Sequence, residues 1–261
     1  MITLITESIS CLTEEDCKKY GVTMIPLTNV VDGAKMTDRI GGVDADRGSF
    51  TLPPSEYDYY HTFYETLKSG NQVICITLSY KLSNAYANAL KSSKMFGPNQ
   101  VAVIDSKSCA GGILLMIMKA RALEAEGLDF KGIVKELLNY RNSITLRFYL
   151  SDIRTIRRSK RISMFSPGAA PILNQKPVFK VENGGVHYFT AKNTVFGCMK
   201  ELVESLKSPR VVVINYSSMS WLQDLVDMVQ KKLPDAEIIL RQATDSMTIN
   251  LGDEIVCVVG D

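Results

Sequence analysis

Apolar runs of strand length alternate with segments of helical spacing along most of the chain, and the clearest run covers residues 73–76. This run is unbroken and rich in β-branched side chains, which is typical of a strand buried on both faces. Small hydroxyl and amide residues follow, and Tyr86, Ala89 and Leu90 then share one helical face. Ser83 therefore lies where the end of a strand meets the start of a helix, a place suited to an anion. The alternative is that Ser83 only caps the helix.

The first 160 residues repeat this alternation of strand and helix. A β-α-β opening predicts parallel strands joined by right-handed crossovers, hence an α/β fold with a Rossmann-like parallel sheet and helices on both faces. Residues 32–52 are polar and Gly-rich without a clear period, and an excursion of this kind is usually functional or disordered. In the helix that starts at Pro53, an aromatic stripe is predicted to face the core. Its members are Tyr57, Tyr60, Phe63, Tyr64 and Leu67.

Composition changes in the segment 152–161, which holds Arg154, Arg157, Arg158, Lys160 and Arg161. Residues 163–174 contain prolines and a glycine, as expected of a crossing between domains. Beyond them, strand-like runs flank residues 182–185, which include Asn-Gly-Gly and predict a hairpin. The order of the remaining strands and helices predicts a mixed or antiparallel sheet with helices on one face. We therefore expect two domains, 1–160 and 161–261.

Charge and composition limit the classes of function. The chain has 261 residues and a net charge of +2 from 30 basic and 28 acidic side chains, so no bulk field favours nucleic acid. The arginine run is typical of a solvated helix face, although one arginine could turn toward an anion. Six scattered cysteines, the lack of a signal-like leader and the short apolar stretches favour a cytoplasmic protein with free thiols.

Candidate catalytic chemistry is sparse. The chain has two histidines, His61 and His187, both interpreted as packing residues, and it lacks GxSxG, HExxH and paired cysteine–histidine spacings. Hydroxyl side chains instead gather at predicted strand ends, beside strongly apolar helices. This combination favours a site that holds a ligand over one that reacts with it, although it leaves acid–base catalysis by carboxylates open.

Six motifs, in order, resemble those of the DegV family of bacterial fatty-acid-binding proteins. The match at residues 76–86 is similar to the family pattern I-T-L-S-S-K-L-S-G-T-Y, and the match at 103–112 is similar to V-I-D-S-K-S-A-S-G-G. The other four matches lie at residues 5–8, 22–27, 157–163 and 174–178. The resemblance is loose beyond residue 178.

This resemblance implies a protein that encloses a long-chain fatty acid in an apolar tunnel between two α/β domains and presents its carboxylate to a separate fatty acid kinase. It implies no enzyme activity of its own, and we expect no cofactor and no metal. It implies carboxylate donors at Thr51 and Ser83, with an arginine from the run, most simply Arg158. Further head-group residues would be Ser55, Asn84 and Thr248. We expect a monomer that binds no nucleic acid and makes at most transient, peripheral contact with a membrane.

Departures from the family pattern leave alternatives open. Glu7 stands where the family entry motif has aspartate, and residues 248–252 carry no histidine where the family has H-x-G-P-G. The head-group chemistry and kinase recognition could therefore have changed. One alternative is a diverged binding or regulatory module for another amphiphile, and another is an enzyme for a small molecule at the strand ends.

Overall fold

A computed structural model describes residues 1–41, 48–159 and 175–261. The helices are η1 (Ser8–Ser10), α1 (Glu14–Tyr20), α2 (Glu56–Lys68), α3 (Ala85–Ser93), α4 (Gly111–Ala125), α5 (Phe130–Tyr140), α6 (Ile153–Arg158), α7 (Val195–Glu204), α8 (Leu222–Lys232) and α9 (Asp245–Leu251). The strands are β1 (Ile2–Glu7), β2 (Val22–Ile25), β3 (Thr28–Val31), β4 (Ala34–Thr37), β5 (Phe50–Leu52), β6 (Gln72–Thr77), β7 (Val101–Asp105), β8 (Thr145–Leu150), β9 (Lys176–Glu182), β10 (Gly185–Lys192), β11 (Val211–Tyr216), β12 (Glu237–Gln242) and β13 (Ile255–Gly260).

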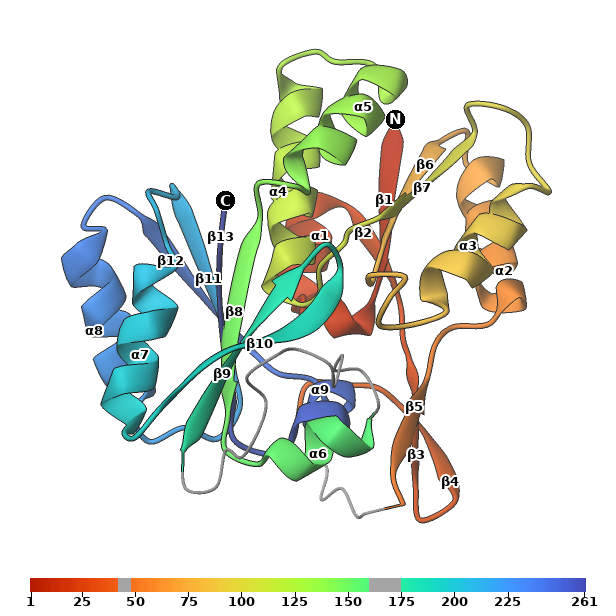
Figure 1. The fold of residues 1–261 in the computed structure, drawn as a ribbon. Helices are drawn as coiled ribbons and strands as arrows, with labels where there is room; N and C mark the ends of the chain where they lie inside the picture. Colours follow the sequence, from red (N-terminus) through yellow and green to blue (C-terminus); the bar gives the residue numbers. More distant parts are fainter. Residues whose placement is uncertain (42–47, 160–174) are drawn as a thin grey trace.

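The strands form three sheets. The N-terminal sheet is parallel and has the order β2-β1-β6-β7, which confirms the predicted α/β class. The C-terminal sheet has the order β10-β9-β8-β13-β11-β12 and is mixed, since β11 and β12 are parallel and the other neighbours antiparallel. A small antiparallel sheet, β4-β3-β5, projects from the N-terminal half (Figure 1).

Helix α4 lies between the two large sheets (Figure 1). Residues 111–117 are all buried, as the apolar sequence of this segment predicts. Gly111 permits the close approach, because a Cβ there would lie 2.7 Å from Val213 Cγ1, and its N–H donates to Asn215 Oδ1 at 2.8 Å. Gly111 thus serves the close packing of α4 against β11.

The outer helices complete the layers. Helices α2 and α3 cover the far face of the parallel sheet, and α7 and α8 cover the far face of the mixed sheet (Figure 1). The prediction of helices on one face of the C-terminal sheet is incomplete, because α4, α6 and α9 share a core with its other face. In α2 the aromatic prediction is wrong for three tyrosines: Tyr57, Tyr60 and Tyr64 are exposed, whereas Tyr59 and Phe63 are buried.

Three further parts of the fold do not follow from the local sequence pattern. Residues 22–31 form two strands in different sheets, since the chain breaks at Pro26, which has no N–H to donate. The polar segment 32–52 contributes β4 and β5, and α9 is an additional helix that the sequence did not predict. The domain boundary at residue 160 stays a prediction. The mixed sheet itself already begins at β8, which pairs with β9 and β13.

Candidate functional site

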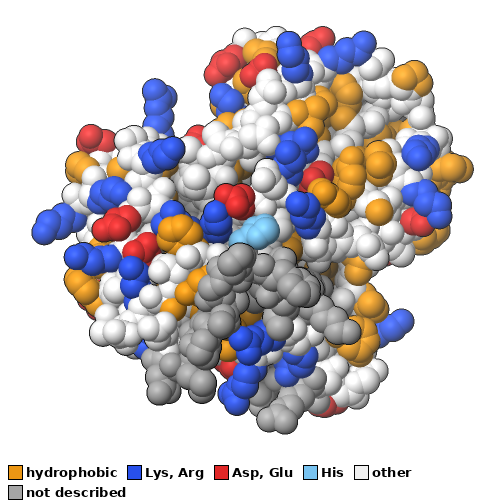
Figure 2. All heavy atoms as spheres, viewed as in Figure 1, with side chains coloured by type: hydrophobic (Ala, Val, Ile, Leu, Met, Phe, Trp, Pro, Cys, Tyr) orange, Lys and Arg blue, Asp and Glu red, His pale blue; other side chains and the backbone are white. Residues whose placement is uncertain are grey.

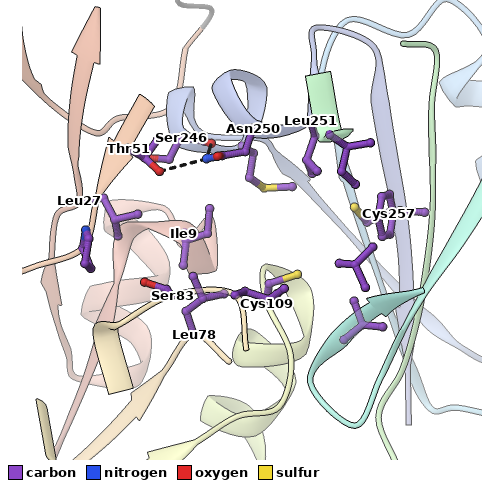
Figure 3. A pocket seen from close by; sticks show the side chains of 17 residues that line it. Ile9, Leu27, Thr51, Leu78, Ser83, Cys109, Ser246, Asn250, Leu251 and Cys257 are labelled. Carbon is purple, nitrogen blue, oxygen red and sulfur yellow. Dashed lines mark hydrogen bonds between the residues drawn. The ribbon is translucent and has the colours of Figure 1, made fainter. Parts of the chain in front are cut away.

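A pocket lies between the two large sheets and encloses about 730 Å³ of atom-free space, including its opening to solvent (Figure 3). Its walls come from η1, β5, the loop after β6, β8, α6, the hairpin β9–β10, α9 and β13. Most of the lining is apolar: Ile9, Leu27, Pro53, Leu78, Leu82, Cys109, Phe148, Ile156, Val181, Val186, Met247, Leu251 and Cys257. Such a surface gains free energy when it covers a hydrocarbon chain.

Polar groups line one side of the pocket. Thr51, Ser246 and Asn250 lie together there (Figure 3). The Asn250 side-chain amide donates to Thr51 Oγ1 at 3.1 Å and to the Ser246 carbonyl at 2.7 Å. These bonds tie β5 to α9 and fix the position of the Thr51 hydroxyl.

A buried carboxylate stands behind this polar side. Asp38 Oδ1 accepts from Asn29 Nδ2 at 3.1 Å and from the Ser246 N–H at 2.7 Å, while its Oδ2 accepts from Ser8 Oγ at 2.6 Å. Asn29 Oδ1 also accepts from Ser246 Oγ at 2.7 Å. Buried charge is costly unless it is hydrogen-bonded, so these donors from three elements stabilise the carboxylate and position α9. We call Asp38 and these partners the Asp38 cluster.

Ser83 lines the opposite wall, across the pocket from Thr51 (Figure 3). Its hydroxyl accepts the N–H of Ala85 at 3.2 Å, and within the described residues it donates to no acceptor. Asn84 is the N-cap residue of α3, and its side chain makes no capping bond. The Ser83 proton is thus available to an acceptor in the pocket.

A second buried carboxyl holds the loop that carries Ser83. Glu7 Oε2 accepts the N–H of Leu78 at 2.8 Å, and Glu7 Oε1 accepts from the Tyr59 hydroxyl. Complete burial raises the pKa of Glu7 to about 7, against the smaller opposing effects of these hydrogen bonds. Leu78 itself lines the pocket, so this Glu7 cluster, made of Glu7, Tyr59 and Leu78, fixes the wall opposite the Asp38 cluster.

The structure brings together two of the residues proposed from sequence, Thr51 and Ser83, in one pocket. Arg158 is exposed at the end of α6, two residues after Ile156, which lines the pocket. Ser55 caps α2 by accepting the Asp58 N–H at 3.2 Å and donating to Asp58 Oδ2 at 2.7 Å. The buried Thr248 hydroxyl donates to the Asp245 carbonyl at 2.9 Å. The head-group roles of these residues stay predictions.

Sequence reasoning missed Asn250 and Ser246, which lie on the unpredicted helix α9, and it missed the role of Asp38. The signal that was present is a polar spacing: Ser246 and Asn250 are four residues apart, as neighbours on one helix face are. Asp38 carried no local signal, because its partner Ser246 is 208 positions away.

The pocket offers little reactive chemistry. Burial raises the pKa of the Cys109 thiol to about 12 and that of Cys257 well above its usual value, so both stay protonated at neutral pH. Among the described residues that line the pocket there is no histidine. The same ranges of the chain hold no cluster of three metal-ligating side chains, and none of their helices is long and apolar enough to cross a bilayer.

These features define a class: a two-domain α/β protein with an apolar cavity between its two large sheets. The family model described as "Uncharacterised protein, DegV family" matches residues 1–260, and the chain belongs to the DegV family.

Individual relatives agree with this assignment. A DegV domain-containing protein of Staphylococcus aureus is 26% identical over 245 residues, which cover 89% of this chain and 87% of that protein. Among solved structures, "Fatty Acid Binding of a DegV family Protein" from Thermus thermophilus has a TM-score of 0.88 at 21% identity, covering 99% of this chain and 98% of the other. A stearic acid-binding protein of Eubacterium ventriosum has a TM-score of 0.86 at 20% identity, with 100% and 98% covered. At these identities the structural likeness establishes the fold.

Proposed function

We propose that this protein binds a long-chain fatty acid in the pocket between its sheets. The observation that carries the proposal is the combination of a continuous apolar lining with hydroxyl groups on facing walls. Similar structures that are described as binding fatty acids, among them stearic acid, support it. Burial of each methylene contributes about 0.8 kcal/mol, so a chain of about 16 carbons gains on the order of 10 kcal/mol before the costs of association.

The carboxylate end needs donors, since a buried unpaired charge would oppose binding. In this proposal the Ser83 hydroxyl donates its unused proton, and Thr51, held by Asn250, donates from the other wall. Each charge-assisted bond contributes about 1.5–3 kcal/mol. Arg158 would approach from the end of α6 to complete the charge balance. Asn84, next to Ser83 in the chain, is a secondary candidate for a carboxylate donor. Ser55 and Thr248 could donate to the carboxylate only after the hydrogen bonds that they make in the structure are broken.

The biological role proposed is carriage without catalysis. The bound carboxylate would be presented at the pocket mouth to a fatty acid kinase, the separate enzyme that phosphorylates it. The carrier would act as a cytoplasmic monomer without a cofactor, and would meet a membrane only transiently when it exchanges lipid.

Native mass spectrometry with lipid extraction tests the binding. We expect a co-purifying mass of a long-chain fatty acid, and retention that falls at least about tenfold in Ser83→Ala and in Thr51→Val. Ser93→Ala is the matched control, because Ser93 lies at the other end of α3 and, in the part of the chain that the structure describes, its hydroxyl donates to Leu90 O of its own helix. A protein that carries no lipid and takes up no added fatty acid would overturn the proposal, and a different extracted amphiphile would favour a diverged module.

Kinase presentation needs a separate test. Purified fatty acid kinase, ATP and the loaded protein should yield acyl phosphate, and the loaded protein without kinase should yield none. If the protein binds fatty acid but the kinase does not phosphorylate the bound acid, the binding function stands and presentation to the kinase is refuted.

A further inference from the structure

A second pocket lies outside the apolar one, where the β9–β10 hairpin, β8 and the segment after α5 meet the loop after β7. It encloses about 880 Å³ of atom-free space, including its open side. Four basic side chains line it, Lys107, Arg141, Arg147 and Lys180, against the single acid Glu182. Figure 2 shows Lys and Arg side chains around the middle of this face, beside a histidine.

Two of these cations are placed side by side by the mixed sheet. Arg147 of β8 and Lys180 of β9 are directly opposite in the antiparallel register. Like charges in this position destabilise a sheet unless an anion compensates them. Lys180 Nζ lies 2.8 Å from Glu182, which is half exposed, and the Arg147 guanidinium lies 3.8 Å from Glu201. The compensation is partial, because Glu201 also pairs with Lys192, whose Nζ lies 2.5 Å from Glu201 Oε1.

Arg147 is also held in place by contacts that leave it charged. Its guanidinium carbon lies 3.8 Å from the centre of the Phe189 ring, and its Nη1 donates to the Glu201 carbonyl at 3.1 Å. These two contacts orient the guanidinium and carry no net charge themselves, whereas the nearby Glu201 carboxylate balances its charge in part.

The other two cations, Lys107 and Arg141, precede β8 in the chain. Arg141 Nη1 donates to the Asp105 carbonyl at 2.6 Å, but its buried Nε has no hydrogen-bond partner. Among the described residues, Lys107 Nζ bonds the neutral acceptor Asn142 Oδ1 at 3.1 Å. Within the same part of the chain neither Arg141 nor Lys107 forms a salt bridge, so both charges are available to an anion in the pocket.

We propose that this basic pocket is a second ligand site and that it binds a phosphate-bearing anion. Phosphate carries close to two negative charges and several acceptor oxygens, and the planar arginine guanidinium matches its geometry. One phosphate group can therefore pair with more than one of these cations. The volume admits an organic phosphate as well as the free ion. The site is separate from the acyl pocket, although Val181 borders both. The same chemistry is offered by a free phosphate compound and by a lipid head group.

Isothermal titration calorimetry of the full chain tests the proposal, with pyrophosphate, ATP and vesicles of phosphatidylglycerol as probes. The test variant is Lys107→Ala with Lys180→Ala, and the matched control is Lys131→Ala with Lys135→Ala, which removes the same charge from α5, where Lys131 and Lys135 are exposed. We expect binding of at least one probe to weaken about tenfold or more in the test variant and about twofold or less in the control. The affinity of the pocket for the bound probe should also fall as the salt concentration rises.

The outcomes separate the sources of the phosphate. Binding of pyrophosphate or ATP alone assigns the site to free phosphates, and binding of vesicles alone assigns it to a lipid head group. Absence of binding for all three probes at low salt, or equal weakening in both variants, would overturn the proposal. Fatty acid uptake measured beside it should be unchanged in both variants, so its loss would bear on the carrier function and not on this site.

Discussion

Two buried carboxyls stand on opposite walls of the apolar pocket, and the protein treats them differently. Asp38 is bonded by three donors from η1, β3 and α9, whereas Glu7 has two, the Tyr59 hydroxyl and the Leu78 N–H. Each carboxyl fixes a wall: the Asp38 cluster holds the Thr51 side and the Glu7 cluster holds the Ser83 side. Complete burial raises the pKa of Glu7 to about 7 against the opposing effect of its two donors, so the hold of the Glu7 cluster on its wall depends on pH.

Removal of the Asp38 carboxylate should have the largest effect. Asp38→Ala leaves the Ser8 hydroxyl, the Asn29 amide and the Ser246 N–H without their acceptor, and each buried unpaired donor costs about 1–3 kcal/mol. We expect the free energy of unfolding in urea to fall by at least about 3 kcal/mol. Asp38→Asn, which keeps one acceptor oxygen, should lose clearly less. Equal losses in the two variants would show that the hydrogen bonds are not what holds this wall.

Glu7 should make stability depend on pH. Because its pKa is raised from 4.5 to about 7, the folded protein binds more protons than the unfolded chain between these values. The contribution of Glu7 to the free energy of unfolding is therefore greatest below pH 4.5, falls as the pH rises to 7 and stays constant above it. The total decrease in this free energy is about 3 kcal/mol.

The measurement is the difference in unfolding free energy between wild type and Glu7→Gln across pH 4.5–8. Glutamine keeps an acceptor and does not titrate, so the variant should gain on the wild type as the pH rises. A difference that stays constant over this range would contradict the assignment of a raised pKa to Glu7.

Tyr59→Phe should have the smallest effect of the three. It removes one of the two donors of Glu7 without changing the packing of the ring, at a cost of about 1–2 kcal/mol above pH 7, where the carboxylate is charged. Loss of a bond to the charged form raises the pKa further, so the pH window should extend above 7. Tyr57→Phe, at a ring 70% exposed, is the control and should change neither quantity.

The local parts of the fold followed from the sequence because short-range rules govern them. The run at 73–76 is the buried centre of β6, as its unbroken apolar pattern predicts. Asn183 and Gly184 turn the β9–β10 hairpin with φ of 50° and 81°, conformations that these two residue types accept more readily than others. Asp129 caps α5 by accepting the Gly132 N–H at 2.8 Å. Ser83 was found in the same way, as a hydroxyl between strand and helix.

The tertiary structure alone decided which of several equivalent local patterns is used. In α2 the tyrosines at 57, 60 and 64 and the pair Tyr59 and Phe63 all have helical spacing, and only the position of the parallel sheet selects the second set for burial. Tyr59 then meets Glu7 across 52 positions. Spacing is a property of neighbours in the chain, whereas these choices depend on packing between distant elements. The sequence by itself thus predicted most strands of the two large sheets, the hairpin and the place of Ser83, whereas Thr51 followed from the family resemblance. The packing of the sheets decided how the pocket is held.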